Sequence, residues 1–193
     1  MYVFKKLMYL IFCKIIFNVK YVNKNLEKNI GRCVVCPNHL CFADPIFMFA
    51  DMKDIAIMGK AELFKNKFVA FLAKCFKIFP IKRGEKDVKS VLHAVNVLKE
   101  EKAERLLVFP EGTRVDEGEF VRGKIGAVYI ALKAGVPILP VRIIKHNSKK
   151  TIFTKVTVIY GAPINLDIDK IKDKEYLSNV TDTMMDYIYN LKE

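Results

Sequence analysis

The chain has 193 residues, which is long enough for one domain with a substantial core and short for two. Hydrophobic residues make up 52% of the chain, and this excludes a disordered or low-complexity protein. The formal net charge of +12 favours anionic partners: nucleic acid, phosphate-bearing substrates or an acidic membrane surface.

The N-terminal segment is both apolar and basic. Residues 1–22 contain no acidic residue and are apolar except for Lys5, Lys6, Lys14, Asn18 and Lys20. A membrane-spanning helix needs about 20 predominantly apolar residues, whereas the longest uncharged run here is Leu7–Cys13. We therefore predict a segment that lies in the membrane interface with its lysines at the headgroups. An ordinary core helix and a shallow span or re-entrant hairpin are the alternatives.

A polar link at residues 23–31 is followed by β-rich runs that alternate with helical patterns. Strands are expected at residues 32–37, 55–59, 105–110, 136–144 and 155–161. A helix over 87–102 is expected to bury one face, made of Val88, Val91, Leu92, Val95 and Leu98. A second helix over 126–135 ends at Gly135, and a terminal helix carries the stripe Val180, Met184, Tyr187, Ile188 and Leu191. This alternation predicts an α/β fold in which helices cover a sheet.

One short stretch, PNHLCFADP at residues 37–45, places His39 five positions before Asp44. It fits a simple turn between elements, a metal site or a catalytic His–Asp pair. In the catalytic interpretation His39 takes a proton from a hydroxyl, and Asp44 accepts from its Nδ1–H across a turn into a helix that begins near Pro45. Solvated surface positions are expected for the other two histidines, His93 and His146.

The cysteines near His39 are poorly spaced for a metal. Cys33 and Cys36 lie in an expected strand, where residues three apart point to opposite faces. His39 and Cys41 follow too closely to form a paired-ligand site. The cysteine count of five argues against a disulfide framework and favours a reducing compartment. These cysteines are most simply small buried hydrophobes, and Cys41 as a nucleophile is a minor alternative.

Basic residues recur where expected strands end. VFPEGTR at residues 108–114 follows a strand and combines a tight turn with Arg114, which suits an anion. Open sheets gather ligands at the carboxyl ends of their strands. The recurrence predicts a phosphate-bearing ligand near Lys60, Lys82, Arg83, Arg122 and Lys124.

Several blocks together resemble those of the glycerolipid acyltransferases, most closely the bacterial 1-acylglycerol-3-phosphate (lysophosphatidic acid) acyltransferases. In the family's order the chain has Asn38, His39 and Asp44; Lys60, Glu62 and Leu63; an apolar stretch ending in Arg83; Phe109–Arg114; Val136–Val141; and Gly161–Ile164. The resemblance covers about residues 30–165. The second block departs from the family's common pattern, because it contains Lys77, Pro80 and Lys82. This departure bears on which headgroup the acceptor carries.

The resemblance implies transfer of an acyl chain from coenzyme A or acyl carrier protein to a lysophospholipid hydroxyl, with no metal and no bound cofactor. His39 would be the general base and Asp44 its orienting partner. Binding of the acceptor would fall to Asn38, Lys60, Arg83, Glu111, Gly112, Thr113, Arg114 and Lys124.

The resemblance also implies a single-domain mixed β-sheet flanked by helices, as in glycerol-3-phosphate acyltransferases. Residues 29–193 would form this catalytic domain. Residues 1–28 would be a helical segment that docks on the anionic cytoplasmic face of the cell membrane.

Three alternative functions remain open at this point. The acceptor could be another lysolipid, or the protein could be a basic membrane-binding protein without catalysis. Specific nucleic-acid binding is disfavoured, because the 14 Phe lie inside apolar runs and the chain has no Trp.

Overall fold

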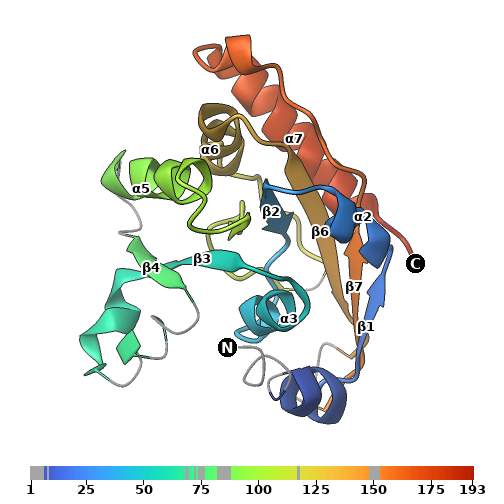
Figure 1. The fold of residues 1–193 in the computed structure, drawn as a ribbon. Coiled ribbons are helices and arrows are strands. Elements are labelled where there is room, and N and C mark those ends of the chain that lie inside the picture. The colour runs from blue at the N-terminus through green and yellow to red at the C-terminus, as the bar shows by residue number, and fades with distance from the viewer. Residues whose placement is uncertain are drawn as a thin grey trace.

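The computed structural model describes residues 7, 9–67, 70–71, 73, 77–81, 88–116, 118–147 and 153–193, without the side chains of Lys60, Leu63 and Ile81. Within these residues, seven strands form one sheet in the order β1-β7-β6-β2-β5-β3-β4 (Figure 1). The strands are β1 (Val19–Val22), β2 (Cys33–Pro37), β3 (Ile55–Lys60), β4 (Ile78–Ile81), β5 (Arg105–Leu107), β6 (Ile138–Lys145) and β7 (Val156–Tyr160).

The sheet is mixed, as predicted. Strand β2 pairs in parallel with both β5 and β6, β3 pairs in parallel with β5, and β4 with β3. Strand β7 runs antiparallel to β6, and β1 is parallel to β7. The carboxyl ends of β2 to β6 therefore meet at one edge of the sheet, where ligands of open α/β sheets gather.

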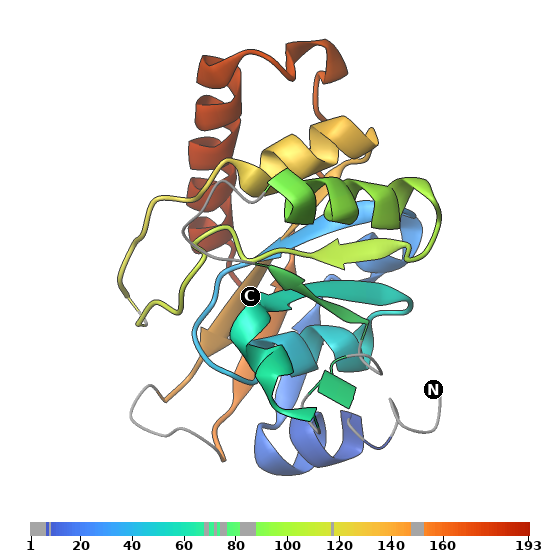
Figure 2. The same ribbon diagram turned by 90° about the vertical axis from the view of Figure 1, so that its left-hand side faces the viewer.

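Helices cover both faces of the sheet (Figure 2). One face is covered by α5 (Val88–Lys99), α6 (Gly126–Ala134) and α7 (Lys174–Asn190). The other face is covered by α3 (Asp44–Asp51) and by the short π-helix η1 (Tyr9–Ile16). The structure also describes α2 (Lys24–Asn29) and the 3₁₀ turns η2 (Ala61–Lys65) and η3 (Ile168–Lys170).

Strand β2 is buried on both faces. Val34 and Cys36 pack into the core beneath α5, α6 and α7, whereas Cys33 and Val35 pack into the core on the α3 side. Cys33 and Cys36 thus point to opposite faces, as predicted. No group of three or more His, Cys, Asp or Glu side chains in the described part of the chain is arranged to hold a metal ion. The metal interpretation of this stretch therefore gains no support.

The N-terminal segment differs from the prediction at Val19–Val22, which pair with β7 as an edge strand. The sheet thus begins before the predicted boundary between residues 28 and 29. The predicted polar link contains α2. Among the described residues no helix has the length and apolarity needed to cross a membrane. Membrane association of this segment stays a prediction.

The predicted buried face of α5 is wrong at two positions. Val95 and Leu98 are buried, but Val88 and Leu92 are 61% and 49% exposed. The helix instead buries Ala94 and Val97 beside Val95 and Leu98, in the core cluster that also contains residues of α6. The terminal helix buries Met184 and Ile188 of its predicted stripe, and Gly135 ends α6 in the left-handed conformation.

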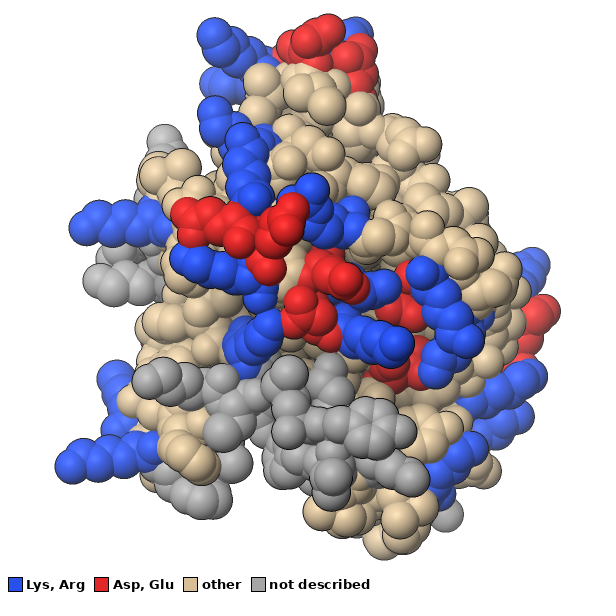
Figure 3. All heavy atoms as spheres, in the orientation of Figure 1, with Lys and Arg blue, Asp and Glu red and all other residues tan. Residues whose placement is uncertain are grey.

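Paired charges gather around the amino ends of β3 and β5. Lys77 binds Asp54, which directly precedes β3, and Lys102 pairs with Glu100 just before β5. Figure 3 shows basic and acidic side chains intermixed over the middle of this face of the molecule. Over the middle of this face, cations and carboxylates of the described residues therefore lie next to one another.

Candidate active site

The turn between β2 and α3 brings His39 onto Asp44. Asp44 starts α3 and is followed by Pro45, whose fixed φ suits the first turn of a helix. The Asp44 Oδ2 atom lies 2.8 Å from His39 Nδ1 and accepts hydrogen bonds of 2.7 Å from the backbone N–H groups of Leu40 and Cys41. The predicted return of Asp44 to Nδ1 is confirmed.

This geometry fixes the state of the imidazole ring. An ionised carboxylate only accepts hydrogen bonds, so Nδ1 carries a proton, and in the neutral imidazole Nε2 then keeps its lone pair. Phe109 stacks on the ring of His39, with 4.0 Å between the two ring centroids. Asp44 is fully buried and His39 is 8% exposed. The pair is therefore held rigidly, with one ring nitrogen able to accept a proton.

Cys41 supports Asp44. Its thiol donates to Asp44 Oδ1 over 3.1 Å. Burial, followed by the nearby negative charge of Asp44, raises the pKa of the Cys41 thiol to about 12. Since the thiolate is the nucleophilic form of cysteine, this site does not favour Cys41 as a nucleophile at neutral pH.

The tight turn after β5 brings a cation close to the backbone. The N–H of Gly112 donates to the carbonyl of Phe109 over 3.0 Å, and Gly112 has a φ of +70°, which favours glycine. A Cβ on Gly112 would lie 2.6 Å from Lys124 Nζ. The backbone N–H of Lys124 donates to the carbonyl of Pro110, so the loop returns to this turn. The absence of a side chain at Gly112 leaves room for the ammonium group.

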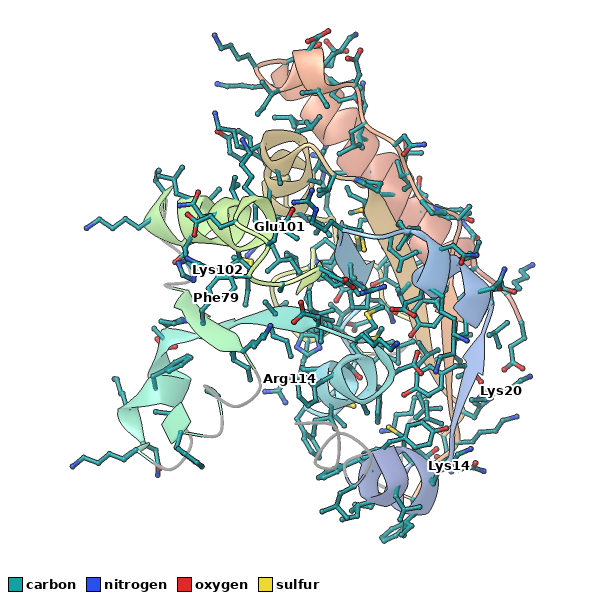
Figure 4. All side chains as sticks on the ribbon, viewed as in Figure 1. Lys14, Lys20, Phe79, Glu101, Lys102 and Arg114 are labelled. Carbon is teal, nitrogen blue, oxygen red and sulfur yellow. The ribbon has the colours of Figure 1, made fainter. Side chains whose placement is uncertain are left out.

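Thr113 and Arg114 are exposed at the end of the same turn. In Figure 4, Arg114 projects between α3 and the segment that carries β3 and β4. Among the described residues, Arg114 and Lys124 make no ion pair. Arg122 differs, because it is held by Asp182 and Ser178 on α7. Arg114 and Lys124, which have no ion partner among the described residues, are thus presented to an anionic ligand.

Glu111 faces the protein rather than the surface. Its Oε2 accepts from the backbone N–H of His39 over 2.9 Å, and its Oε1 accepts from the Tyr189 hydroxyl over 2.5 Å. The side chain is 2% exposed, and burial raises the pKa of its carboxyl group. The backbone N–H of Val115 also donates to the carbonyl of His39. The turn after β5 is thus joined to the β2–α3 turn at the backbone of His39. Acceptor binding by Glu111 stays a prediction.

Three predicted binding residues have different outcomes. Asn38 extends the pairing of β2 with β6, because its amide donates to the carbonyl of Ile143 and accepts from the N–H of Ile143. The backbone of Lys60 ends β3 at the same edge of the sheet. The side chain of Lys60 and the whole of Arg83 lie outside what the structure describes, so their binding roles stay predictions.

Sequence reasoning missed three residues that touch this site. Phe109 belongs to the block Phe109–Arg114, which the sequence analysis had assigned to the same site as the block that contains His39. A contact between Phe109 and His39 could therefore have been predicted. Cys41 was considered as a metal ligand, a nucleophile or a small buried hydrophobe, and not as a donor to Asp44. Tyr189 lies next to the predicted buried stripe of α7, and nothing in the local sequence marks it.

Comparison with known proteins identifies the family. A sequence profile described as Acyltransferase matches residues 18–144. The 1-acyl-sn-glycerol-3-phosphate acyltransferase of Bacillus subtilis (strain 168) is 32% identical over 180 residues, which cover 90% of this chain and 88% of that protein. The enzyme with the same name from Streptococcus pneumoniae (strain ATCC BAA-255 / R6) is 34% identical, over 70% of this chain and 52% of its own length.

A solved structure has the same fold. The crystal structure of the 1-acyl-sn-glycerophosphate (LPA) acyltransferase PlsC from Thermotoga maritima superimposes with a TM-score of 0.66. The two chains are 23% identical, and the match covers 91% of this chain and 73% of that one. The sequence matches over most of the chain show that this protein is an enzyme of the acyltransferase family.

Proposed function

We propose that this enzyme transfers an acyl chain from an acyl thioester to the free sn-2 hydroxyl of 1-acylglycerol-3-phosphate, giving phosphatidic acid for phospholipid synthesis. The observation that carries this proposal is the buried His39–Asp44 pair next to a turn at which Arg114 and Lys124 have no ion partner among the described residues. The names of the relatives from Bacillus and Streptococcus support the same acceptor. The thioester is carried by coenzyme A or acyl carrier protein and is a co-substrate, and no bound cofactor takes part.

In the proposed reaction His39 Nε2 takes the proton of the acceptor hydroxyl as its oxygen attacks the thioester carbonyl carbon. The new C–O bond gives a tetrahedral intermediate, and its collapse breaks the C–S bond. The leaving thiolate then takes the proton from His39 Nε2. Asp44 keeps the ring in the right tautomer and stabilises the imidazolium that forms between the two steps.

The phosphate of the acceptor would bind at the turn after β5. Arg114 and Lys124 supply positive charge, and Thr113 supplies a hydroxyl group. Lys60 is placed at the same edge of the sheet by its position at the end of β3, and Arg83 follows β4, whose carboxyl end lies at that edge too. We assign both to the same phosphate. A phosphomonoester has more negative charge than a phosphodiester, so this cluster favours lysophosphatidic acid over lysolipids with larger headgroups.

The first prediction concerns acceptor and base. The purified protein should acylate lysophosphatidic acid faster than lysophosphatidylglycerol or a lyso-aminolipid, with acyl-coenzyme A or acyl carrier protein as donor. His39→Ala should lower the rate by roughly 10²–10⁴, the usual contribution of a general base. His93→Ala is the matched control, because this histidine is exposed on α5 and meets the ring of Phe79 edge-on.

Two outcomes would contradict the proposal. Equal rates over all headgroups would exclude lysophosphatidic acid as the preferred acceptor. Full activity in folded His39→Ala would exclude the mechanism. A protein that binds vesicles but turns over no acceptor would support the non-catalytic alternative.

We further propose that the N-terminal segment docks on the anionic cytoplasmic face of the membrane. The short helix η1 leaves Leu10 and Ile15 53% and 63% exposed beside Lys14, and it packs against α3. Phe42 lies in the turn between His39 and Asp44 and is 51% exposed. Exposed apolar side chains next to lysines are typical of interfacial binding. This placement would bring the site to the plane in which the acceptor lies.

Vesicle sedimentation tests this second prediction. Leu10→Ser combined with Ile15→Ser should reduce binding to vesicles with anionic lipid by roughly tenfold, since each change removes an apolar side chain from the interface. Leu92→Ser is the control, because Leu92 is about equally exposed on α5, on the other face of the sheet. Equal loss of binding in both variants would place the docking surface elsewhere.

A further inference from the structure

The last turns of α7 reach the candidate active site through one side chain. Tyr189 donates its hydroxyl hydrogen to Glu111 Oε1, and the other oxygen of Glu111 accepts from the backbone N–H of His39. A chain of two hydrogen bonds, 2.5 Å and 2.9 Å long, therefore joins the terminal helix to the backbone of the proposed base.

The two oxygens of Glu111 are both taken up by donors of the protein. The carboxylate is 2% exposed, so it depends on these donors rather than on water. The other titratable groups around it are His39 and Asp44 from the β2–α3 turn, while Arg142 of β6 acts on Tyr189. A buried carboxylate that is held on both sides transmits a displacement of one donor to the other.

Other contacts hold the neighbouring loop against the same helix. The ring of Phe120 lies 5.2 Å from the ring of Tyr189, measured between centroids. Arg122 binds Asp182 through two hydrogen bonds, of 3.0 Å and 2.7 Å. A Cβ on Gly123 would lie 2.7 Å from Met185 Cγ, so backbone and helix touch directly. The loop that carries Lys124 and the buried Glu111 are thus both held by contacts with α7.

We propose that Tyr189 is a positioning residue for acyl transfer, which holds Glu111 and through it the backbone of His39. The proposal uses the acyl transfer of the previous section as a readout, and it assigns Tyr189 no contact with either substrate. Its hydroxyl is already engaged with Glu111. Removal of that hydroxyl should change the alignment of the base and leave substrate binding largely intact.

The test compares Tyr189→Phe with Tyr187→Phe. Tyr187 lies on the same helix, and its hydroxyl accepts from the backbone N–H of Ala162, away from His39. Tyr189→Phe should lower kcat by about 10- to 100-fold, the size expected from misplacing a reacting group by a fraction of an ångström to an ångström. Its KM should stay within about twofold, and Tyr187→Phe should change neither constant.

The pH profile gives a second readout. The hydrogen bond from Tyr189 lowers the pKa of Glu111, so its loss makes that pKa higher still. Glu111 then takes up its proton at a higher pH, and the negative charge that strengthens its hydrogen bond from the His39 N–H is lost earlier as the pH falls. The acidic side of the rate profile of Tyr189→Phe should therefore move to higher pH. A purely structural role would lower stability and leave this profile in place.

A double variant tests whether Tyr189 acts through Glu111. Glu111→Gln keeps an acceptor for the His39 N–H and removes the charge. In that background Tyr189→Phe should cause much less than its single-variant loss of kcat, because both changes act on one path. Independent, multiplying losses would overturn the proposal, and so would a kcat of Tyr189→Phe equal to that of Tyr187→Phe.

Hydrogen exchange at the His39 amide separates this proposal from the proposed function. Exchange of this one amide should be faster in Tyr189→Phe than in the wild type and unchanged in Tyr187→Phe. That measurement needs no substrate. An inactive wild type would contradict the proposed function, whereas an unchanged His39 amide would contradict the role of Tyr189.

Discussion

The two ends of the parallel strands use their charges differently. At the amino ends Lys77, Lys102 and Arg105 are paired with carboxylates, and Arg105 and its partner Glu27 are each 4% exposed. At the carboxyl ends, Arg114 and Lys124 are exposed and make no ion pair with the described residues. Paired charges at one end stabilise the sheet, and unpaired charges at the other remain available to a ligand.

The buried ion pair at the amino end joins three segments. Arg105 Nε lies 2.7 Å from Glu27 Oε1, its Nη2 donates to the carbonyl of Glu27, and its Nη1 donates to the carbonyl of Lys53. These contacts tie α2 and the turn before β3 to β5. Burial raises the pKa of Glu27 although the charge of Arg105 lowers it. The pair is therefore costly to bury, and loss of one partner is more costly still.

The largest expected effect on stability comes from this pair. Glu27→Ala removes the buried carboxylate partner of Arg105 and leaves the exposed Glu104 as its other one, so it should lower the free energy of unfolding by roughly 1.5–3 kcal/mol. The kcat of the protein that remains folded should not change. Lys102→Gln is the control, because its exposed pair with Glu100 is worth at most about 1 kcal/mol. A loss of kcat in Glu27→Ala without loss of stability would contradict the view that charges at the amino ends of the strands stabilise the fold and those at the carboxyl ends bind a ligand.

A smaller effect is expected at the other end, where Arg114→Ala should change binding and not stability. A hydrogen bond to a charged group contributes about 1.5–3 kcal/mol, so the KM for lysophosphatidic acid should rise about 10- to 100-fold. An acceptor that lacks the phosphate should show no such rise. Arg122→Ala is the matched control from the same loop, since its charge is already bound by Asp182. An equal rise of KM in Arg114→Ala and Arg122→Ala would show that the net positive charge of the loop decides binding, whatever the position of the arginine.

Much of the catalytic edge could be predicted from the sequence. The blocks fall at strand ends, and parallel strands bring their carboxyl ends to one edge. The turn of four residues between His39 and Asp44 is short enough that local geometry decides their contact. Gly112 and Gly135 likewise mark backbone positions with positive φ. Each of these features depends on a few consecutive residues.

The missed features depend on contacts between distant segments. Val19–Val22 pairs with β7, more than 130 residues later, and its apolar sequence looks like a continuation of the N-terminal run. Strand β4 was not predicted, because the stretch around residues 79–84 was interpreted through its basic residues Lys82 and Arg83. Tyr189 reaches Glu111 across 78 positions, and a single tyrosine on a helix carries no sign of its partner. The inward face of α5 is set by its neighbour α6, and periodicity alone could not fix it.

Gly123 has a consequence for exchanging parts between relatives. A side chain there would collide with Met185 and with Thr181, since a Cβ would lie 2.7 Å and 2.9 Å from their nearest atoms. The loop around residue 123 and the terminal helix are therefore a matched pair of surfaces. A chimaera that takes this loop from another family member should keep its activity only when the terminal helix is transplanted together with it.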